Sequence, residues 1–115
     1  MIPDDFAAEW ESAWNAHDLD RIMRHYHPDI RFRSEKAVAL TGSGDISGAD
    51  ALRACWAKAL DQQADLEFQV IDVFHGHEML VLTYRNHHGV LAAEPLYFDE
   101  TGLAYQGAAC HRKGH

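Results

Sequence analysis

The second half of this chain alternates between polar and apolar residues, and this pattern is the strongest constraint on its fold. From residue 66 onward the alternation continues through four stretches separated by turn residues such as Gly76 and Gly102. A period of two residues is typical of a β-strand with one buried face. Four such stretches at hairpin spacing predict an antiparallel meander, with strands at 66–74, 80–85, 90–98 and 103–111.

The first half repeats at helical spacing and predicts three helices. Their apolar stripes are Phe6, Trp10, Ala13 and Trp14, then Leu19, Ile22, Met23 and Tyr26, and finally Leu52, Cys55, Trp56, Ala59 and Leu60. Asp18 is placed to cap the second helix, which Pro28 ends, and Ser47 to cap the third. A strand with Ile30, Phe32 and Ser34 on one face precedes a loop at 41–48. Helices on one face of such a sheet define an α+β domain.

The length and charge of the chain narrow its class. A chain of 115 residues predicts one domain, spanning 1–115. Its net charge of −8 argues against a nucleic-acid surface and against docking on an anionic membrane. Its apolar runs fall far short of the roughly 20 residues of a membrane span, and its start lacks the features of a signal peptide. Two cysteines make no disulfide framework, which favours a cytoplasmic setting.

Three segments resemble a known family. They are WNAHDLDRIMRHYHPDIRF (14–32), ISGADALRACWAKAL (46–60) and FDETGLAYQG (98–107), and they are similar to the nuclear transport factor 2-like superfamily, in its SnoaL-like branch. The resemblance implies a cone, in which a mixed, mostly antiparallel sheet curls around three helices. It also implies a pocket at the wide end and homodimers through the sheet. Members of this superfamily include isomerases, cyclases, dehydratases and non-catalytic modules, so the fold does not fix the function.

Glu94 is the most informative position in the chain. On the strand 90–98 its face is shared by apolar residues only, namely Val90, Ala92, Leu96 and Phe98. Burial among these groups raises the pKa of a carboxyl group and makes Glu94 a candidate acid or base. The adjacent Pro95 leaves an alternative open, because a bulge beside it would turn Glu94 outward.

The resemblance extends to the ketosteroid isomerases, which belong to the same superfamily. It places Glu94 where those enzymes keep a protonated aspartate, Ser34 where they keep the aspartate base, and Trp10 where they keep a tyrosine. A serine alone is no base near neutral pH, and an indole N–H is a weaker donor, so steroid isomerisation by that mechanism is not expected. SnoaL-like cyclases use one pocket carboxyl group as acid and base, a scheme that suits Glu94.

Further candidates come from the other predicted inward faces. His111 shares a face with Leu103, Tyr105, Gly107 and Ala109, and if that face is inward, Glu94 and His111 would form a proton relay. Six aromatic residues are candidates for lining a pocket that binds a small apolar molecule, with core packing as the alternative for each. They are Trp10, Trp14, Tyr26, Phe32, Trp56 and Tyr84.

The nine histidines do not predict a metal site. His75 and His77 fall at one hairpin turn, and His87 and His88 at another. The strand between them, at about 3.3 Å per residue, separates the two groups by roughly 30 Å. Neither group alone supplies the three or four ligands that zinc needs. We therefore expect surface histidines, and neither a metal nor another cofactor.

Two hypotheses for function follow from the sequence. The first is a cofactor-free enzyme that isomerises, cyclises, dehydrates or hydrates a small apolar molecule, with Glu94 as acid or base and with Ser34 and His111 as auxiliary groups. The alternative is a non-catalytic ligand-binding or dimerisation module. In either case a homodimer is expected to keep the acidic residues of 59–111 at the rim of its interface.

Overall fold

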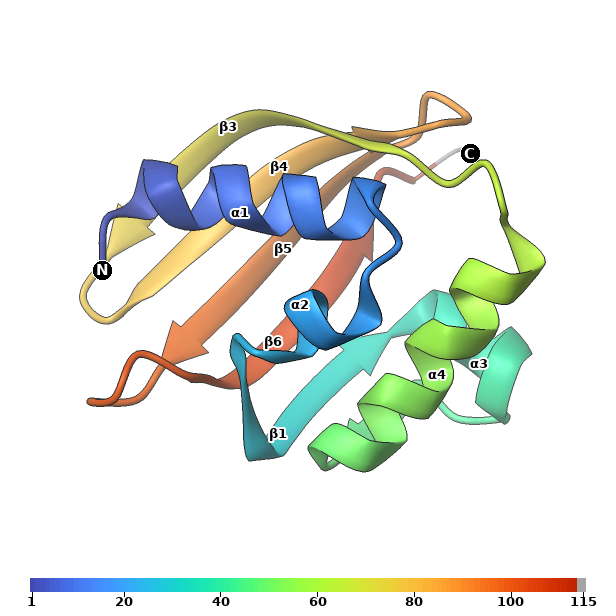
Figure 1. The fold of residues 1–115 in the computed structure, drawn as a ribbon, viewed down its shortest axis with the longest axis horizontal. Helices are drawn as coiled ribbons and strands as arrows, with labels where there is room; N and C mark the ends of the chain where they lie inside the picture. Colours follow the sequence, from blue (N-terminus) through green and yellow to red (C-terminus); the bar gives the residue numbers. More distant parts are fainter. Residues whose placement is uncertain (114–115) are drawn as a thin grey trace.

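A curved, open six-stranded sheet forms the body of the molecule (Figure 1). The computed structural model describes residues 1–113, and the strands lie in the order β2-β1-β6-β5-β4-β3. The predicted meander is confirmed as β3 (Phe68–Gly76), β4 (Met79–Asn86), β5 (Leu91–Phe98) and β6 (Ala104–His111). β1 (Tyr26–Ser34) runs parallel to β6 and pairs with a short antiparallel β2 (Asp45–Ser47), so the sheet is mixed and mostly antiparallel.

Four helices lie in the N-terminal half, one more than predicted. They are α1 (Pro3–Asn15), α2 (Leu19–Met23), α3 (Glu35–Thr41) and α4 (Ala49–Gln62). α2 is shorter than expected, because Tyr26 begins β1 instead of ending the helix. α3 and β2 were missed because they are short: each buries a single residue, Ala37 and Ile46, which is too little to produce a periodic pattern.

The two predicted helix caps differ in outcome. Asp18 caps α2 as expected, and its carboxylate accepts a hydrogen bond of 3.2 Å from the backbone N–H of Arg21. The prediction that Ser47 caps α4 was wrong. Ser47 is paired with Arg31 in the sheet, and the N-cap position falls on Gly48, whose φ of +93° favours glycine.

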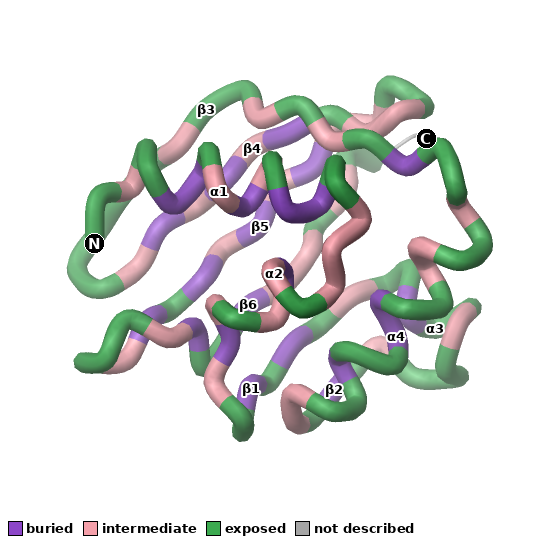
Figure 2. Tube along the Cα trace, viewed as in Figure 1, coloured by how far each residue is buried: buried purple, intermediate pink, exposed green. Residues whose placement is uncertain are grey.

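The core lies between the helices and the inner face of the sheet, where Figure 2 shows the buried segments of α1, β4 and β5. Irregularities in strand pairing shift two of the predicted faces. In β3, a register shift between Val70 and Asp72 turns Val73 inward and leaves Phe74 exposed. Opposite Tyr97 and Phe98, a second shift exposes Tyr105, which was predicted to share the face of His111.

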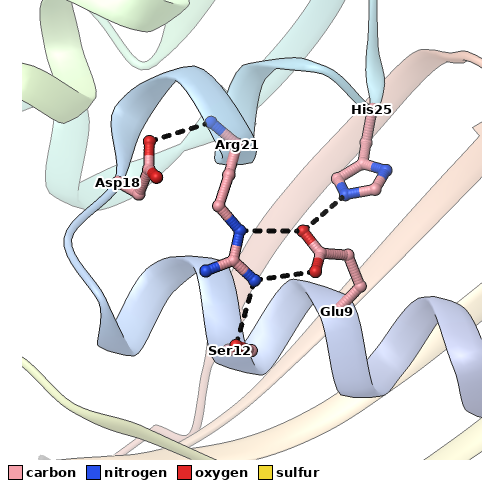
Figure 3. Close-up of polar contacts among 5 residues, drawn as sticks. All are labelled: Glu9, Ser12, Asp18, Arg21 and His25. Atoms are coloured by element: carbon pink, nitrogen blue, oxygen red, sulfur yellow. Dashed lines mark hydrogen bonds and ion pairs between the residues drawn. The ribbon is translucent and has the colours of Figure 1, made fainter.

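Polar side chains join α1 to α2 and to the start of β1 (Figure 3). The Arg21 guanidinium donates to both carboxylate oxygens of Glu9, at 2.7 and 3.4 Å, and to Ser12 Oγ at 3.0 Å. The hydrogen bond from Arg21 lowers the pKa of Glu9. The His25 Nε2 atom lies 3.8 Å from the same carboxylate, although burial lowers the pKa of His25. These contacts join α1 to α2 and β1, and α1 carries Trp10, which acts on Glu94.

Candidate functional site

A cavity of about 100 Å³ lies at one end of the sheet, between α3, α4, the β4–β5 hairpin and the end of β6. Since one water needs roughly 10–15 Å³ of such space, the cavity accommodates several waters or a small organic molecule. Seven of the nine residues predicted for the site line it: Trp14, Phe32, Ser34, Trp56, Tyr84, Glu94 and His111. The structure thus brings together residues from α1, α4 and four strands.

Trp10 and Tyr26, the other two predicted site residues, are not among the cavity-lining residues within 1–113. Both are buried in the core and act on the carboxyl group of Glu94. The Trp10 ring packs against both Phe68 and Tyr84, with centroid distances of 5.4 and 4.9 Å. The two residues therefore contribute to the surroundings of Glu94 and not to the cavity wall.

Glu94 points inward from β5 and is only 4% exposed. The pairing of Val81 with Pro95 continues the register that pairs Leu82 with Glu94, so no bulge turns the side chain outward. The Tyr84 hydroxyl donates to Oε1 at 3.3 Å, whereas Oε2 has no hydrogen-bond partner within residues 1–113. A carboxyl group in this setting is buried but only partly hydrogen-bonded.

Burial raises the pKa of Glu94 from 4.5 to about 8. The Trp10 indole N–H and the hydroxyls of Tyr84 and Tyr26 oppose this rise, because they favour the carboxylate. Trp10 Nε1 makes no hydrogen bond of ordinary geometry in the described part of the chain, so its effect comes from a polar N–H facing the carboxyl group. At pH 7 the Glu94 side chain is mostly a neutral acid, able to donate its proton.

His111 faces the same cavity from the neighbouring strand. It pairs with Ala92, which places it diagonally across from Glu94. The Cα atoms of such diagonal neighbours lie about 7–8 Å apart in an antiparallel pair. No hydrogen bond joins the two side chains in the described structure, so a relay between them needs a ligand or a water. Burial and then the positive charge of Lys36 lower the pKa of His111, which leaves the imidazole neutral at pH 7.

His87 is a cavity residue that sequence reasoning missed, because a position in a hairpin turn indicated a surface histidine. Its side chain is only 9% exposed, lines the cavity and lies against the tilted ring of His88 at a centroid distance of 4.0 Å. The turn is fixed by Asn86, whose Oδ1 accepts from the N–H groups of His88 and Val90. The available signal was Asn86 itself, since an asparagine side chain commonly bonds the backbone two residues on and so organises a tight turn.

The histidines of the described residues do not gather into a cluster of metal ligands. Within 1–113, no three side chains of His, Cys, Asp or Glu gather closely enough to hold an ion.

Cys55 is buried at the cavity and Cys110 is exposed on β6, and both are free thiols. None of the described helices is long and apolar enough to cross a membrane.

The curved open sheet, the helices on one face and the cavity at one end define an α+β domain of the cystatin-like type. The family model for the SnoaL-like domain matches residues 7–113, and the chain belongs to this family. A search of curated proteins finds no match. The structure is similar to that of a SnoaL-like protein of unknown function from Burkholderia thailandensis, with 33% identity and a TM-score of 0.89 over 96% of this chain and 94% of that one.

Two more distant structures share the fold. A candidate polyketide cyclase from Sinorhizobium meliloti is 13% identical, with a TM-score of 0.75 over 91% of this chain and 93% of that one. A candidate isomerase of the SnoaL-like family from Agrobacterium tumefaciens is 12% identical, with a TM-score of 0.75 over 96% and 97%. At these identities the likeness shows the common fold alone, which is used for more than one chemistry.

Proposed function

We propose that this protein is a cofactor-free acid–base enzyme that acts on a small, mostly apolar carbonyl compound. The observation that supports the proposal is the raised pKa of Glu94 at the wall of the cavity, which keeps its carboxyl group protonated at neutral pH. A neutral acid in an apolar site donates a hydrogen bond, or a proton, to a carbonyl oxygen as negative charge develops there. The reaction class is isomerisation, cyclisation, dehydration or hydration.

The position of His111 supports a division of roles. With Cα atoms about 7–8 Å apart, the two side chains can contact one ligand between them. The carbonyl oxygen of the ligand then lies against Glu94, and the carbon next to the carbonyl group lies against the imidazole. The lowered pKa of His111 makes the neutral, basic imidazole the main form at pH 7. In this arrangement Glu94 is the acid, His111 takes the proton from carbon, and Tyr84 supports the carboxyl group through its hydroxyl.

The test uses acetophenone as a probe, with exchange of its methyl protons in D2O followed by NMR. We expect the wild-type protein to accelerate the exchange, and Glu94→Gln to slow it by about 10²-fold or more, because an amide cannot give up a proton. The rate should fall above about pH 8, where Glu94 loses its proton. Glu78→Gln, on an exposed turn, is the matched control and should match the wild-type rate.

The outcome also separates the two hypotheses. Binding of acetophenone without accelerated exchange would favour a non-catalytic binding module. An unchanged exchange rate in Glu94→Gln would remove Glu94 from the mechanism.

We also propose a homodimer through the outer face of the sheet. Phe74 and Tyr97 are 59% and 37% exposed there. A shallow hollow in the same face is lined by Pro95, Tyr97 and Gln106, among others. Exposed aromatic residues on a sheet face are typical of an interface core.

In sedimentation we expect a dimer at micromolar concentration and a monomer for Phe74→Lys, because the lysine places a charge in the buried interface. Val38→Lys, which changes an exposed apolar residue of α3, should leave the dimer intact. A monomeric wild-type protein would refute this part of the proposal.

A further inference from the structure

The rim of the cavity has a charge opposite to that of the whole protein. The chain has a net charge of −8, yet Glu94 is the only acidic residue among the described residues that line the cavity, and it is neutral at pH 7. The rim instead contains Lys36, from α3, whose charge acts on His111. A cavity whose lining carries one ammonium group and no ionised carboxylate presents a local site for an anion in an otherwise acidic protein.

His87 provides the second observation, independent of the charge. Both of its ring nitrogens are buried, and neither makes a hydrogen bond within residues 1–113. The Asp65 carboxylate approaches Nε2 to 3.5 Å, but Asp65 is 80% exposed and the contact lacks the geometry of a hydrogen bond. A buried polar group left without a partner costs roughly 1–3 kcal/mol, which a ligand that pairs with it would recover.

The cavity therefore combines separate polar groups with an apolar wall. The inner end contains the neutral Glu94 and the Tyr84 hydroxyl, and the rim contains Lys36 and His87. The apolar part of the cavity wall includes the rings of Trp14, Phe32 and Trp56. Glu94 pairs with Leu82 in β4, and His87 lies five residues further along, roughly 16 Å at about 3.3 Å per residue. The side chains of Glu94 and His87 both line this space, so a ligand that pairs with both carries polar groups at its opposite ends.

From this arrangement we infer that the ligand is a small aromatic carboxylate with a carbonyl group at its opposite end. The carboxylate lies at the rim, where it pairs with the Lys36 ammonium and accepts a hydrogen bond from His87. The ring packs among the tryptophans, and the carbonyl oxygen accepts a hydrogen bond from Glu94. The inference rests on the proposed function, because it uses the same cavity and the same neutral acid, and it adds the anionic head group.

Calorimetric titration with three related probes tests the inference. The probe 4-acetylbenzoate has both polar ends, its methyl ester lacks the charge, and 4-isopropylbenzoate lacks the carbonyl group. We expect the acid to bind about 10-fold more tightly than the ester, and several-fold more tightly than the isopropyl compound, as charge-assisted and neutral hydrogen bonds predict. Lys36→Met should abolish the preference for acid over ester, and His87→Phe should reduce it. Arg53→Met, which removes an equal charge from the exposed side of α4, should leave it unchanged.

Three results would overturn the inference: equal affinity for acid and ester, a preference that survives in Lys36→Met, or no binding of 4-acetylbenzoate at millimolar concentration. Acetophenone, which has no head group, distinguishes this failure from failure of the proposed function. If acetophenone still undergoes exchange that depends on Glu94, the anionic end alone is wrong. If it does not, the acid–base proposal fails as well.

Discussion

Replacing Glu94 with glutamine should make the protein markedly more stable than the wild type at pH 9, and about equally stable at pH 5. In the folded protein the pKa of Glu94 is about 8, against 4.5 as its ordinary value. The folded state therefore holds this proton more tightly than the unfolded chain. The stability that the proton contributes is fully present below about pH 4.5 and is lost as the pH rises to about 8.

The expected size of this effect is large for a single group. Each unit of pKa shift corresponds to about 1.4 kcal/mol, so the shift of Glu94 predicts a loss on the order of 5 kcal/mol across this range. Glutamine has nearly the same shape and stays neutral, so the variant should not show this loss. Urea unfolding of both proteins at pH 5, 7 and 9 measures the difference directly.

Two half-buried histidines do not obscure the comparison. The pKa values of His25 and His111 are lowered, so their contribution to stability is lost as the pH falls below about 6.5, the opposite direction to Glu94. Both histidines are present in the wild type and in the variant, and their effects cancel in the difference. Parallel stability curves for the two proteins from pH 5 to 9 would mean that Glu94 is not held neutral by the fold.

Shortening Trp10 to alanine should cost about 3–5 kcal/mol of unfolding free energy, the range found for large aromatic core residues. The ring is 2% exposed and fills the space between α1 and the pair Phe68 and Tyr84. Its loss also opens a path for water toward Glu94. Because burial is the main cause of the raised pKa, we expect the pKa of Glu94 to fall in this variant.

Trp10→Phe is the matched control and should shift the pKa in the opposite direction. Phenylalanine keeps most of the packing but removes the indole N–H, which favours the carboxylate. The pKa of Glu94 should therefore rise in Trp10→Phe and fall in Trp10→Ala. Carboxyl NMR titration of the two variants, with urea unfolding for stability, checks both directions. A shift of the same sign in both variants would show that burial by the Trp10 ring and the polar Trp10 N–H do not act on Glu94 in opposite directions.

Long, regular elements of this fold could be predicted from the sequence. The alternation in 90–98 predicted both β5 and the inward direction of Glu94, because every other residue on its face of the strand is apolar. The helical spacing of Phe6, Trp10 and Trp14 predicted α1 and its buried side. In these segments three or more buried residues recur at the spacing of one element, so the repeat identifies both the element and its buried face.

The parts that could not be predicted depend on short elements and on local departures from regularity. α3 supplies Lys36 to the cavity rim, yet its seven residues bury only Ala37. The exposure of Tyr105 follows from one extra residue in β6, which no period of two reveals. The inward position of His87 depends on a turn organised by the Asn86 side chain. Sequence patterns therefore predicted the inner end of the cavity and missed most of its rim.

Acid catalysis and the binding of a carbonyl oxygen both depend on a Glu94 carboxyl group that the fold holds neutral at physiological pH. The most direct test is ¹³C NMR of the glutamate side-chain carboxyl carbons, titrated from pH 3 to 10 and assigned with Glu94→Gln. We predict that the resonance of Glu94 has a midpoint near pH 8. A midpoint for Glu94 near the ordinary value of 4.5 would contradict the account.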